Sequence, residues 1–593
     1  MKRLLFLTII LNLTLLSAMS KKADDKLIDD WEYNSTALLE DSKNLRVNNS
    51  RTLSMRMSAP KAYRSKKMIG MSVGGAKDTN NFKANIDNGY LPKLDSITYE
   101  GQFYNHYFDT GLKGDECKSL FCPSYATAKR NNIFSNQDEY FMTVGLNSGI
   151  EEKAFKRKKL NLVVVLDISG SMNSAFNSYF YDKVGNKVET KENSSKQKMQ
   201  IANESIVAML GHLKDDDRVG VVLFDHNAYL AKPLNLVGTT DKKAIRDHIL
   251  ELKARGGTNW SAGYKKALKL FDEVKESLEY ENRIIFLTDA MPNRGELGKD
   301  KLFGMAKRAS TKGIHTTFIG IGVDFNNDLV EYVSKTKGAN YFSVHSSKAF
   351  SKLLDKEFDY MVTPLVYDLN LKLKSTAYTI EGVYGSPDAK LATGTVMNIN
   401  TLFPSHNNGE ATKGGVVLIK LKKNKNISQD TNISLEVSYK DVDGKEFSNK
   451  QSVKFAKKDN YYDNSGIRKA ILVSDYVTIM KNWLIDTRAG CNDKVKWVME
   501  SPIAIMKRCT LYPPKHPLYP VVSTWERKSC KLQVSKGYKQ LFERFRSFYI
   551  KEMSILKDDS LNKELSIIDT LLKQKSIEIK SKNIPKDDWE FRQ

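Results

Sequence analysis

Three short segments of the chain carry oxygen-bearing side chains that could together hold a hard cation. The first reads Asp-Ile-Ser-Gly-Ser at 167–171, the second Gly-Gly-Thr-Asn at 256–259, and the third Thr-Asp at 288–289. Carboxylate and hydroxyl oxygens, with no thiol or imidazole among them, favour Mg²⁺, Mn²⁺ or Ca²⁺ over zinc or copper. The candidate metal residues are Asp167, Ser169, Ser171, Thr258 and Asp289.

The elements around these segments are typical of an α/β doubly wound parallel sheet of Rossmann-like type. Four runs are apolar on successive residues, as strands buried on both faces must be: 160–166, 219–224, 284–287 and 316–321. Stretches with helical spacing separate these runs, and strands that alternate with helices predict a parallel sheet. Ligands bind beyond the carboxyl ends of such strands, so Asp167 and Asp289 should meet at one edge. The glycines at 256–257 would let the backbone approach a ligand closely.

This trio of segments resembles the metal-ion-dependent adhesion site (MIDAS) of von Willebrand factor type A domains. The family pattern is Asp-x-Ser-x-Ser, a distant Thr and a later Thr-Asp, and residues from about 158 to 365 contain every part in order. The resemblance implies that Ser169, Ser171 and Thr258 coordinate directly, whereas Asp167 and Asp289 act largely through waters. Mg²⁺ keeps several waters and an open position, which a Glu or Asp of a protein partner could fill.

An insertion beside the site limits what the resemblance implies. A polar insertion at about 173–196 would lie next to the metal, so the partner surface of the family cannot be transferred.

Both carboxylates, Asp167 and Asp289, are expected on loops at the mouth of the sheet. Replacing either Asp167 or Asp289 with Ala should therefore abolish metal-dependent binding with little loss of fold.

Three neighbouring features have a structural and a functional interpretation each. Trp260 follows the metal loop and could touch a ligand, but a large aromatic at a helix start more often packs inside. Arg294 could meet an anionic partner, although a solvated loop charge is the simpler interpretation. The acidic segment at 324–328 lacks the spacing and final glutamate of an EF-hand and is expected to cap the next helix.

Enzymatic alternatives have weaker signals. Ser169 and Ser171 follow a strand, but the Gly-x-Ser-x-Gly elbow of hydrolases is absent. The Asp-Thr-Gly triplet at 109–111 occurs once, whereas an aspartic protease needs two such carboxylates. A haloacid-dehalogenase-type phosphatase would need a second Asp where Ser169 stands, and no His-Glu-x-x-His is present. We therefore expect no enzymatic activity, and a hydrolase with an unrecognised site is a third-ranked alternative.

The N-terminus predicts export. Two basic residues precede an apolar run at 4–16 and a small-x-small pattern that ends at Ser20, which is typical of a signal peptide. A membrane anchor is the alternative, but the run is short of the roughly 20 residues that a span requires. No later run is long enough, so the mature chain is expected to be soluble or peripheral, in the periplasm, at the cell surface or outside.

The net charge of +23 comes mostly from lysines spread along the chain. No helix-turn-helix, zinc-finger or aromatic RNA-binding motif accompanies them, so nucleic acid is not an expected partner. Solubility, or contact with an anionic envelope or membrane surface, explains the charge better. Of five cysteines, Cys117 and Cys122 could close a small loop, and two of Cys491, Cys509 and Cys530 could pair.

The rest of the chain divides by pattern. Pieces such as 97–99 and 140–144 look like strands, and the period becomes two from 369 to 373. We predict that the two β regions pair into one β-sandwich into which the type A domain is inserted. The expected units are a signal peptide (1–20), a flexible stem (21–89), an N-terminal β region (90–157), the type A domain (158–364), a second β region (365–456) and a mainly helical region (457–593).

The wider arrangement resembles exported bacterial proteins of the calcium-activated chloride channel-like type, although no channel-forming segment is present. That wider label implies no mechanism, and the function expected from the type A resemblance is metal-dependent adhesion or protein binding. The alternative is an envelope scaffold whose metal only stabilises the fold. In the family, partner binding can shift the last helix of the domain, here at 348–361, and the signal would then pass into the second β region.

Overall fold

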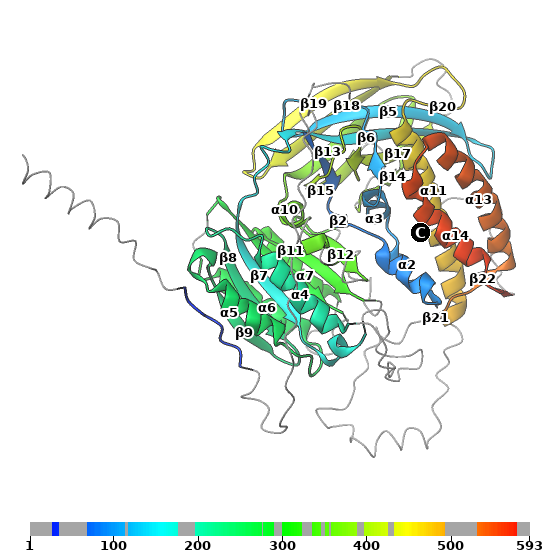
Figure 1. Ribbon diagram of the computed structural model, residues 1–593. Helices are drawn as coiled ribbons and strands as arrows, with labels where there is room; N and C mark the ends of the chain where they lie inside the picture. Colours follow the sequence, from blue (N-terminus) through cyan, green and yellow to red (C-terminus); the bar gives the residue numbers. More distant parts are fainter. Residues whose placement is uncertain are drawn as a thin grey trace, which may run out of the picture.

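The structure, a computed structural model, describes residues 27–34, 68–112, 117–175, 196–274, 277–289, 299–322, 332, 335–345, 350, 352–354, 357–387, 396–424, 432–492 and 530–577. They form two sheet domains and a layer of helices (Figure 1). Several predictions lie outside these residues: the signal peptide, most of the 173–196 insertion, Arg294, the acidic segment at 324–328, and Cys509.

The first domain, here called the parallel-sheet domain, has the predicted doubly wound sheet. Its strand order is β2-β12-β11-β10-β7-β8-β9, and only β9 runs antiparallel to its neighbour. The strands are β2 (Gly75–Ala76), β7 (Lys159–Asp167), β8 (Arg218–Phe224), β9 (Ala228–Leu236), β10 (Tyr280–Thr288), β11 (Ile314–Ile321) and β12 (Asn340–Val344). All four apolar runs are strands of this sheet, so the prediction of its fold class is confirmed.

Helices cover both faces of this sheet, which explains its continuous apolar runs. Along β7, Leu162, Val164 and Leu166 belong to one core, while Val163 and Val165 belong to the other. Each of these five side chains is fully buried. The helices are α4 (Lys198–Leu210), α5 (Lys242–Leu250), α6 (Trp260–Phe271), α7 (Lys299–Thr311) and the short α10 (Phe358–Met361), which lies within the predicted last helix.

The second domain is one antiparallel sheet of ten strands. Its main order is β14-β17-β6-β1-β15-β13-β18-β19, and β5 joins β6 to β20. The strands are β1 (Met68–Val73), β5 (Cys122–Asn131), β6 (Asp138–Glu151), β13 (Val366–Lys374), β14 (Tyr378–Tyr384), β15 (Val396–Ser405), β17 (Val416–Lys423), β18 (Asn432–Asp441), β19 (Glu446–Lys454) and β20 (Tyr461–Tyr462). We call it the curled-sheet domain.

The two predicted β regions share this sheet. Strand β6 from the first region pairs with β17 from the second, from Val144 opposite Val417 to Tyr140 opposite Leu421. The strands form one hydrogen-bonded sheet rather than the two sheets of a sandwich. The sheet curls around its core, as a contact between the two ends of the strand order shows: the rings of Tyr378 of β14 and Phe455, just after β19, lie 4.9 Å apart.

The expectation of a flexible stem up to residue 89 is wrong for its last third. Strand β1 lies between β6 and β15, with Ile69 and Met71 buried, and β2 pairs with β12 of the parallel sheet. Helix α2 (Asn80–Asp87) follows. The run at 68–73 is short and contains Gly and Met, which have little intrinsic strand preference, so its place depends on distant partners. The segment thereby connects the two sheets.

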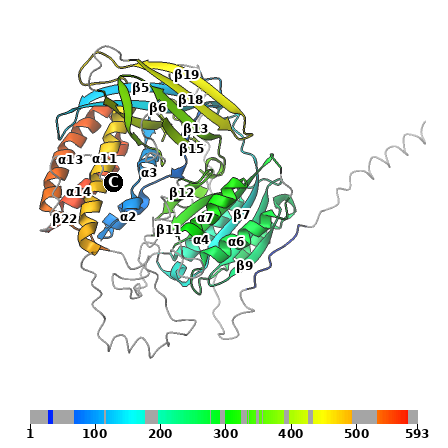
Figure 2. The same cartoon turned by 180° about the vertical axis from the view of Figure 1, so that it is seen from behind.

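Helices pack on one face of the curled sheet. The long helices are α11 (Ser465–Asn492), α13 (Lys536–Leu556) and α14 (Asn562–Leu572). They bury a core with Phe141 of β6 and Leu418 of β17. In both views they lie on one side of the molecule and the parallel-sheet domain on the other (Figures 1 and 2). No helix of the described part is long and apolar enough to cross a membrane.

Short elements complete the layer, and one of them corrects a prediction. The strand expected at 97–99 is wrong, because Thr98 caps α3 (Tyr99–Tyr104) by accepting a hydrogen bond from the Gly101 N–H. Three two-stranded pairs join distant segments: β3 (Tyr90–Leu91) with β21 (Cys530–Lys531), β4 (Tyr107–Phe108) with β16 (Thr412–Lys413), and β22 (Val534–Ser535) with β23 (Ser576–Ile577).

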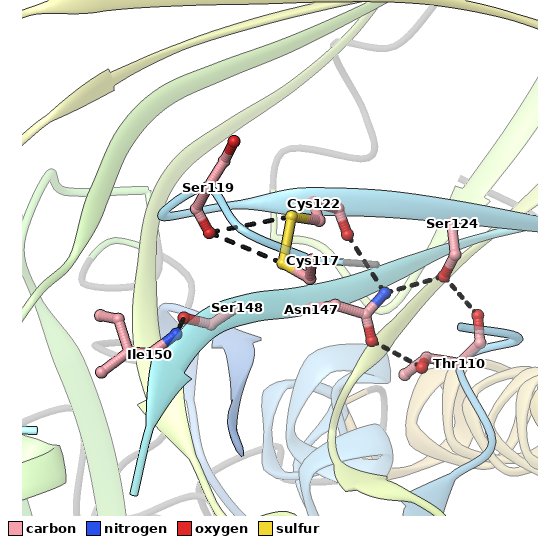
Figure 3. Close-up of a disulfide and its surroundings, with 8 residues drawn as sticks. All are labelled: Thr110, Cys117, Ser119, Cys122, Ser124, Asn147, Ser148 and Ile150. Atoms are coloured by element: carbon pink, nitrogen blue, oxygen red, sulfur yellow. Dashed lines mark hydrogen bonds between the residues drawn. A yellow bond between two sulfur atoms is a disulfide. The ribbon is translucent and has the colours of Figure 1, made fainter. Parts of the chain in front are cut away.

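A disulfide joins Cys117 to Cys122 at the start of β5, as one of the predicted pairings (Figure 3). Asn147 of β6 donates to the Cys122 carbonyl and to the Ser124 hydroxyl, which anchors this end of the strand. Cys530 is also disulfide-bonded.

Replacing Cys117 and Cys122 together by Ser should lower the free energy of unfolding by about 2 kcal/mol. The disulfide closes a short loop, and a loop of this length removes only that much entropy from the unfolded chain. Urea denaturation followed by tryptophan fluorescence measures the effect. An unchanged midpoint, with wild type kept oxidised as the control, would contradict it.

A buried ion cluster connects the two domains at Glu357, the N-cap residue of α10. Its carboxylate accepts from Lys413 Nζ at 3.2 Å and lies 3.2 Å from His406 Nε2. Burial raises the pKa of Glu357, but the hydrogen bond with His406 and the charge of Lys413 outweigh burial and hold the pKa at about 2. The titratable groups that face it are Lys77, Tyr104, Tyr107, Tyr360, His406 and Lys413.

This cluster predicts acid sensitivity between about pH 4.5 and pH 2. A carboxyl with a folded-state pKa below its unfolded value contributes stability above pH 4.5, and that stability is lost as the pH falls toward 2. Lys77, whose pKa is about 7, and the tyrosines, whose pKa values are raised, do not change charge in this window. Wild type should lose roughly 2–3 kcal/mol across it from Glu357 alone. Glu357→Gln should show a correspondingly flatter melting temperature against pH, and identical slopes would contradict the assignment.

Candidate metal-ion site

The predicted metal residues lie at the carboxyl edge of the parallel sheet. Asp167 is the last residue of β7 and Asp289 follows β10, and these strands are neighbours. Ser169 and Ser171 lie on the turn after β7, which continues as the 3₁₀ helix Gly170–Asn173. Thr258 lies just before α6. All five side chains are buried, and both carboxylates are fully so.

A chain of hydrogen bonds connects four of these residues. The Ser169 N–H donates to Asp167 Oδ1 at 2.8 Å, and its Oγ lies 3.0 Å from Ser171 Oγ. Ser171 Oγ donates to Asp289 Oδ1 at 2.8 Å, so Ser169 must donate to Ser171. Thr288 Oγ1 donates to the second oxygen of Asp167 at 2.6 Å. Two carboxylates and three hydroxyls are therefore held together in a small volume.

Backbone hydrogen bonds hold the loop of Thr258 against the turn after β7. The Gly170 N–H donates to the Gly256 carbonyl at 3.0 Å, and the Arg255 N–H donates to the Ile168 carbonyl at 2.6 Å. Gly256 has φ +74°, and a Cβ there would lie 2.5 Å from the His226 ring. Position 256 therefore requires glycine, because of its positive φ and its closeness to His226. The loop brings Thr258 to the same edge as the two serines.

Lys198, which no sequence pattern indicated, lies in the site. Its ammonium donates to Asp289 Oδ2 at 3.0 Å, and both side chains are fully buried. Lys198 is the first residue of α4, 91 positions before Asp289. Lys198 is one of 93 Lys and Arg residues of the chain, and only long-range packing distinguishes it from the others. His345, after β12, lies near enough to Lys198 for the charge of the lysine to act on it. Burial and then that charge lower the pKa of His345 to about 3.

The electrostatics of the site favour a cation. Burial, and then the negative charge of Asp289, raise the pKa of Asp167 to about 7. Of these two buried carboxylates, Asp289 forms an ion pair with Lys198. Among the described residues no group of three or more His, Cys, Asp or Glu could hold a metal, so a metal here needs the hydroxyl oxygens. A hard dication fits such an oxygen set and supplies the missing positive charge.

Two other candidates from the sequence have structural roles. Trp260 is buried, with its ring 4.9 Å from that of Phe286, and its Nε1 donates to Thr288 Oγ1 at 3.3 Å, which supports the packing interpretation. In the Asp-Thr-Gly triplet, Asp109 accepts from the Gly111 N–H at 2.9 Å, and Thr110 donates to Asn147 at 2.6 Å (Figure 3). These contacts shape a turn beside the disulfide.

Comparisons with known proteins agree with this architecture. Residues 162–292 match the family model described as von Willebrand factor type A domain. Inter-alpha-trypsin inhibitor heavy chain H2 of Mus musculus is 24% identical over 226 residues, which are 37% of this chain and 21% of that protein. The uncharacterized protein sll0103 of Synechocystis is 28% identical over 179 residues, 30% of this chain and 36% of that protein. The chain thus spans only about a fifth to a third of these relatives' length.

Solved structures give a weaker likeness. The von Willebrand factor type A protein from Catenulispora acidiphila has a TM-score of 0.40 at 14% identity and covers 65% of this chain and 84% of that one. Proximal thread matrix protein 1 from the mussel byssus, in a form with a zinc-occupied MIDAS motif, has a TM-score of 0.27 at 19% identity and covers 35% of this chain and 49% of that one. The match to the von Willebrand factor type A family model, residues 162–292, therefore falls on the parallel-sheet domain that carries the candidate metal residues.

Proposed function

We propose that the parallel-sheet domain binds a divalent cation, Mg²⁺, Mn²⁺ or Ca²⁺, and uses it to grip a carboxylate of a protein partner. The observation that carries the proposal is the buried hydrogen-bond chain that joins Asp167, Ser169, Ser171 and Asp289. Among the described residues, the cluster has two carboxylates, and Lys198 pairs with one of them, Asp289. A dication is the simplest species that would complete it.

The residues would divide the work by their charge. The hydroxyls of Ser169, Ser171 and Thr258 are the proposed direct ligands, and they bring no charge to the ion. Asp167 and Asp289 would hold its waters and balance its charge from behind. An ion with few anionic ligands stays electrophilic, so a Glu or Asp side chain of a partner can fill its open position.

For the whole chain, the proposed role is that of an exported, non-enzymatic adhesion or assembly protein. The positive net charge of +23 supports peripheral contact with an anionic envelope or membrane surface. The Lys198–Asp289 pair weighs against the scaffold alternative, because an internal counter-ion lets the fold exist without metal. The Glu357 cluster offers a route from α10 to the curled sheet for any shift that the partner causes.

The test is capture of envelope proteins on the immobilised full chain, in Mg²⁺ and in EDTA. We expect a partner that binds only with Mg²⁺ and is displaced by free glutamate-containing peptides. Retention of the same partner in EDTA would contradict metal-dependent recognition. Turnover of an ester, phosphate or peptide substrate by the purified chain would favour the hydrolase alternative instead.

A further inference from the structure

Residues 27–34, which the sequence analysis assigned to a flexible stem, lie against the free edge of the parallel sheet. Strand β9 is last in the strand order. The Glu32 N–H donates to the Ala231 carbonyl of β9 at 2.8 Å, and the Ile28 N–H donates to the Thr239 carbonyl at 2.9 Å. The Asp241 N–H returns a bond to the Ile28 carbonyl at 2.8 Å. Figure 1 shows this dark blue segment beside β9 and α5.

An ion pair with a buried lysine fixes the middle of this segment. Asp30 Oδ2 accepts from Lys232 Nζ at 2.9 Å and from Asn235 Nδ2 at 2.7 Å. The Lys232 side chain is fully buried on β9, and its other acceptors are the carbonyls of Val219 and Pro233. Breaking such a pair leaves an uncompensated buried charge, which is strongly unfavourable. The domain is therefore built to receive a carboxylate at this position.

The residues on either side of Asp30 make further contacts with the domain. Trp31 stacks on His248 of α5, with ring centroids 5.4 Å apart and planes 8° from parallel, and Asp29 pairs with the same histidine at 2.9 Å. Tyr33 packs edge-on against Tyr229 at 5.4 Å. Both Trp31 and Tyr33 rest on the apolar core of the domain. The segment is thus an acidic and aromatic peptide in a matching site.

The far end of the segment reaches the loop that carries Thr258. The Arg255 guanidinium lies 5.5 Å from the Tyr33 ring and 5.1 Å from the Tyr229 ring. Arg255 Nε also donates to Asp225 Oδ2 at 3.1 Å. The Arg255 N–H bonds to Ile168, between the metal residues Asp167 and Ser169. A contact that restrains Arg255 therefore restrains both the loop of Thr258 and the turn after β7.

We propose that residues 27–34 are a strap that docks in cis on β9 and α5 and, through Tyr33 on Arg255, fixes the loop of Thr258 for metal binding. The proposal rests on the proposed metal site and adds its regulation. Whatever lifts the strap, such as proteolysis or a partner that takes up the acidic and aromatic segment, weakens the hold on the metal and on the partner's carboxylate. Supporting groups that orient ligands in this way are typically worth roughly 10-fold or more in metal affinity.

The experiment uses the full chain and two readouts, hydrogen–deuterium exchange of residues 27–34 and Mn²⁺ affinity by calorimetry. In wild type the amides of Ile28 and Glu32 should be protected. Trp31→Ala should expose them, and Trp31→Ala and Tyr33→Ala should both weaken Mn²⁺ binding roughly 10-fold. Tyr33→Phe keeps the ring over Arg255 and should restore wild-type affinity. Glu32→Ala is the matched control, because this exposed side chain lies in the same strap.

Each other outcome has a distinct meaning. Exchange of 27–34 at the rate of an unfolded peptide in wild type would overturn the docking. Release of the strap with unchanged Mn²⁺ affinity would make it a cover for the edge of β9 and overturn its control of the site. Absence of Mn²⁺ binding by wild type would refute the proposed function and that control together, while protection from exchange would still establish that the segment docks.

Discussion

In the Asp167→Asn variant we expect Mn²⁺ and Mg²⁺ affinity to fall by roughly 100-fold, with no loss of thermal stability in EDTA. The variant removes a full negative charge from the site and so removes part of what holds a dication. It should not harm the metal-free fold, because burial and the charge of Asp289 already raise the pKa of Asp167 to about 7. A carboxyl whose folded-state pKa is raised destabilises the fold when it is ionised, and a neutral amide relieves that cost.

Titration calorimetry in both metals, with thermal melts in EDTA, measures the two expectations separately. Asp272→Asn is the matched control, because Asp272 is an exposed carboxylate of the same domain at the end of α6. Metal affinity equal to wild type in Asp167→Asn would refute the site assignment. A collapse of the wild-type melting temperature when EDTA removes the metal would favour the scaffold alternative.

Asp289 is expected to behave differently, and this corrects the expectation that either carboxylate can be removed with little loss of fold. That expectation placed both on loops at the mouth of the sheet, whereas both are fully buried. Asp289 pairs with the buried Lys198, so its removal leaves an ammonium without its counter-ion. Breaking a buried pair from one side typically costs about 3–5 kcal/mol. Asp289→Asn should therefore lose both metal affinity and stability.

The strands of the parallel sheet were predictable because their signal is local. Side chains of β7 alternate between two cores, so a strand covered on both faces must be apolar at every position. The topology then fixes where such strands end, which is why Asp167 and Asp289 could be placed at one edge from the sequence alone. Their burial could not be foreseen, since it depends on how the loops at 168–174 and 255–259 close over them.

The parts that sequence reasoning missed depend on partners far along the chain. Strand β1 pairs with residues near 147 and 405, and its own six residues show no clear alternation. The segment 27–34 is placed by contacts with Lys232, His248 and Arg255, about 200 positions away. Lys198 acquires its role only when α4 packs beside the end of β10. In each case the contacts that place the residues lie too far along the chain for a local pattern to indicate them.

Replacing Lys198 with Met should raise divalent-cation affinity by at least about 10-fold. The ammonium lies 3.0 Å from Asp289 Oδ2, so it competes with the metal for the same carboxylate and repels the dication. A pair of unit charges 4 Å apart interacts by about 4 kcal/mol at the dielectric constant of a protein surface, which exceeds the 1.4 kcal/mol of a 10-fold change. The metal-free variant should be less stable than wild type by about 3–5 kcal/mol, because Asp289 loses its counter-ion.

Thermal melts measure both effects: in EDTA the melting temperature of Lys198→Met should be lower than that of wild type, and its rise on adding Mn²⁺ should be larger. Lys196→Met is the matched control, since Lys196 is exposed and pairs with the exposed Glu204. Lys198→Gln keeps a hydrogen-bond donor without the charge, so it should also bind Mn²⁺ more tightly while losing less stability. Weaker Mn²⁺ binding in both variants would mean that the lysine organises the site rather than opposes the metal. Stronger binding would make Lys198 the internal cation that the metal replaces as the counter-charge of Asp289.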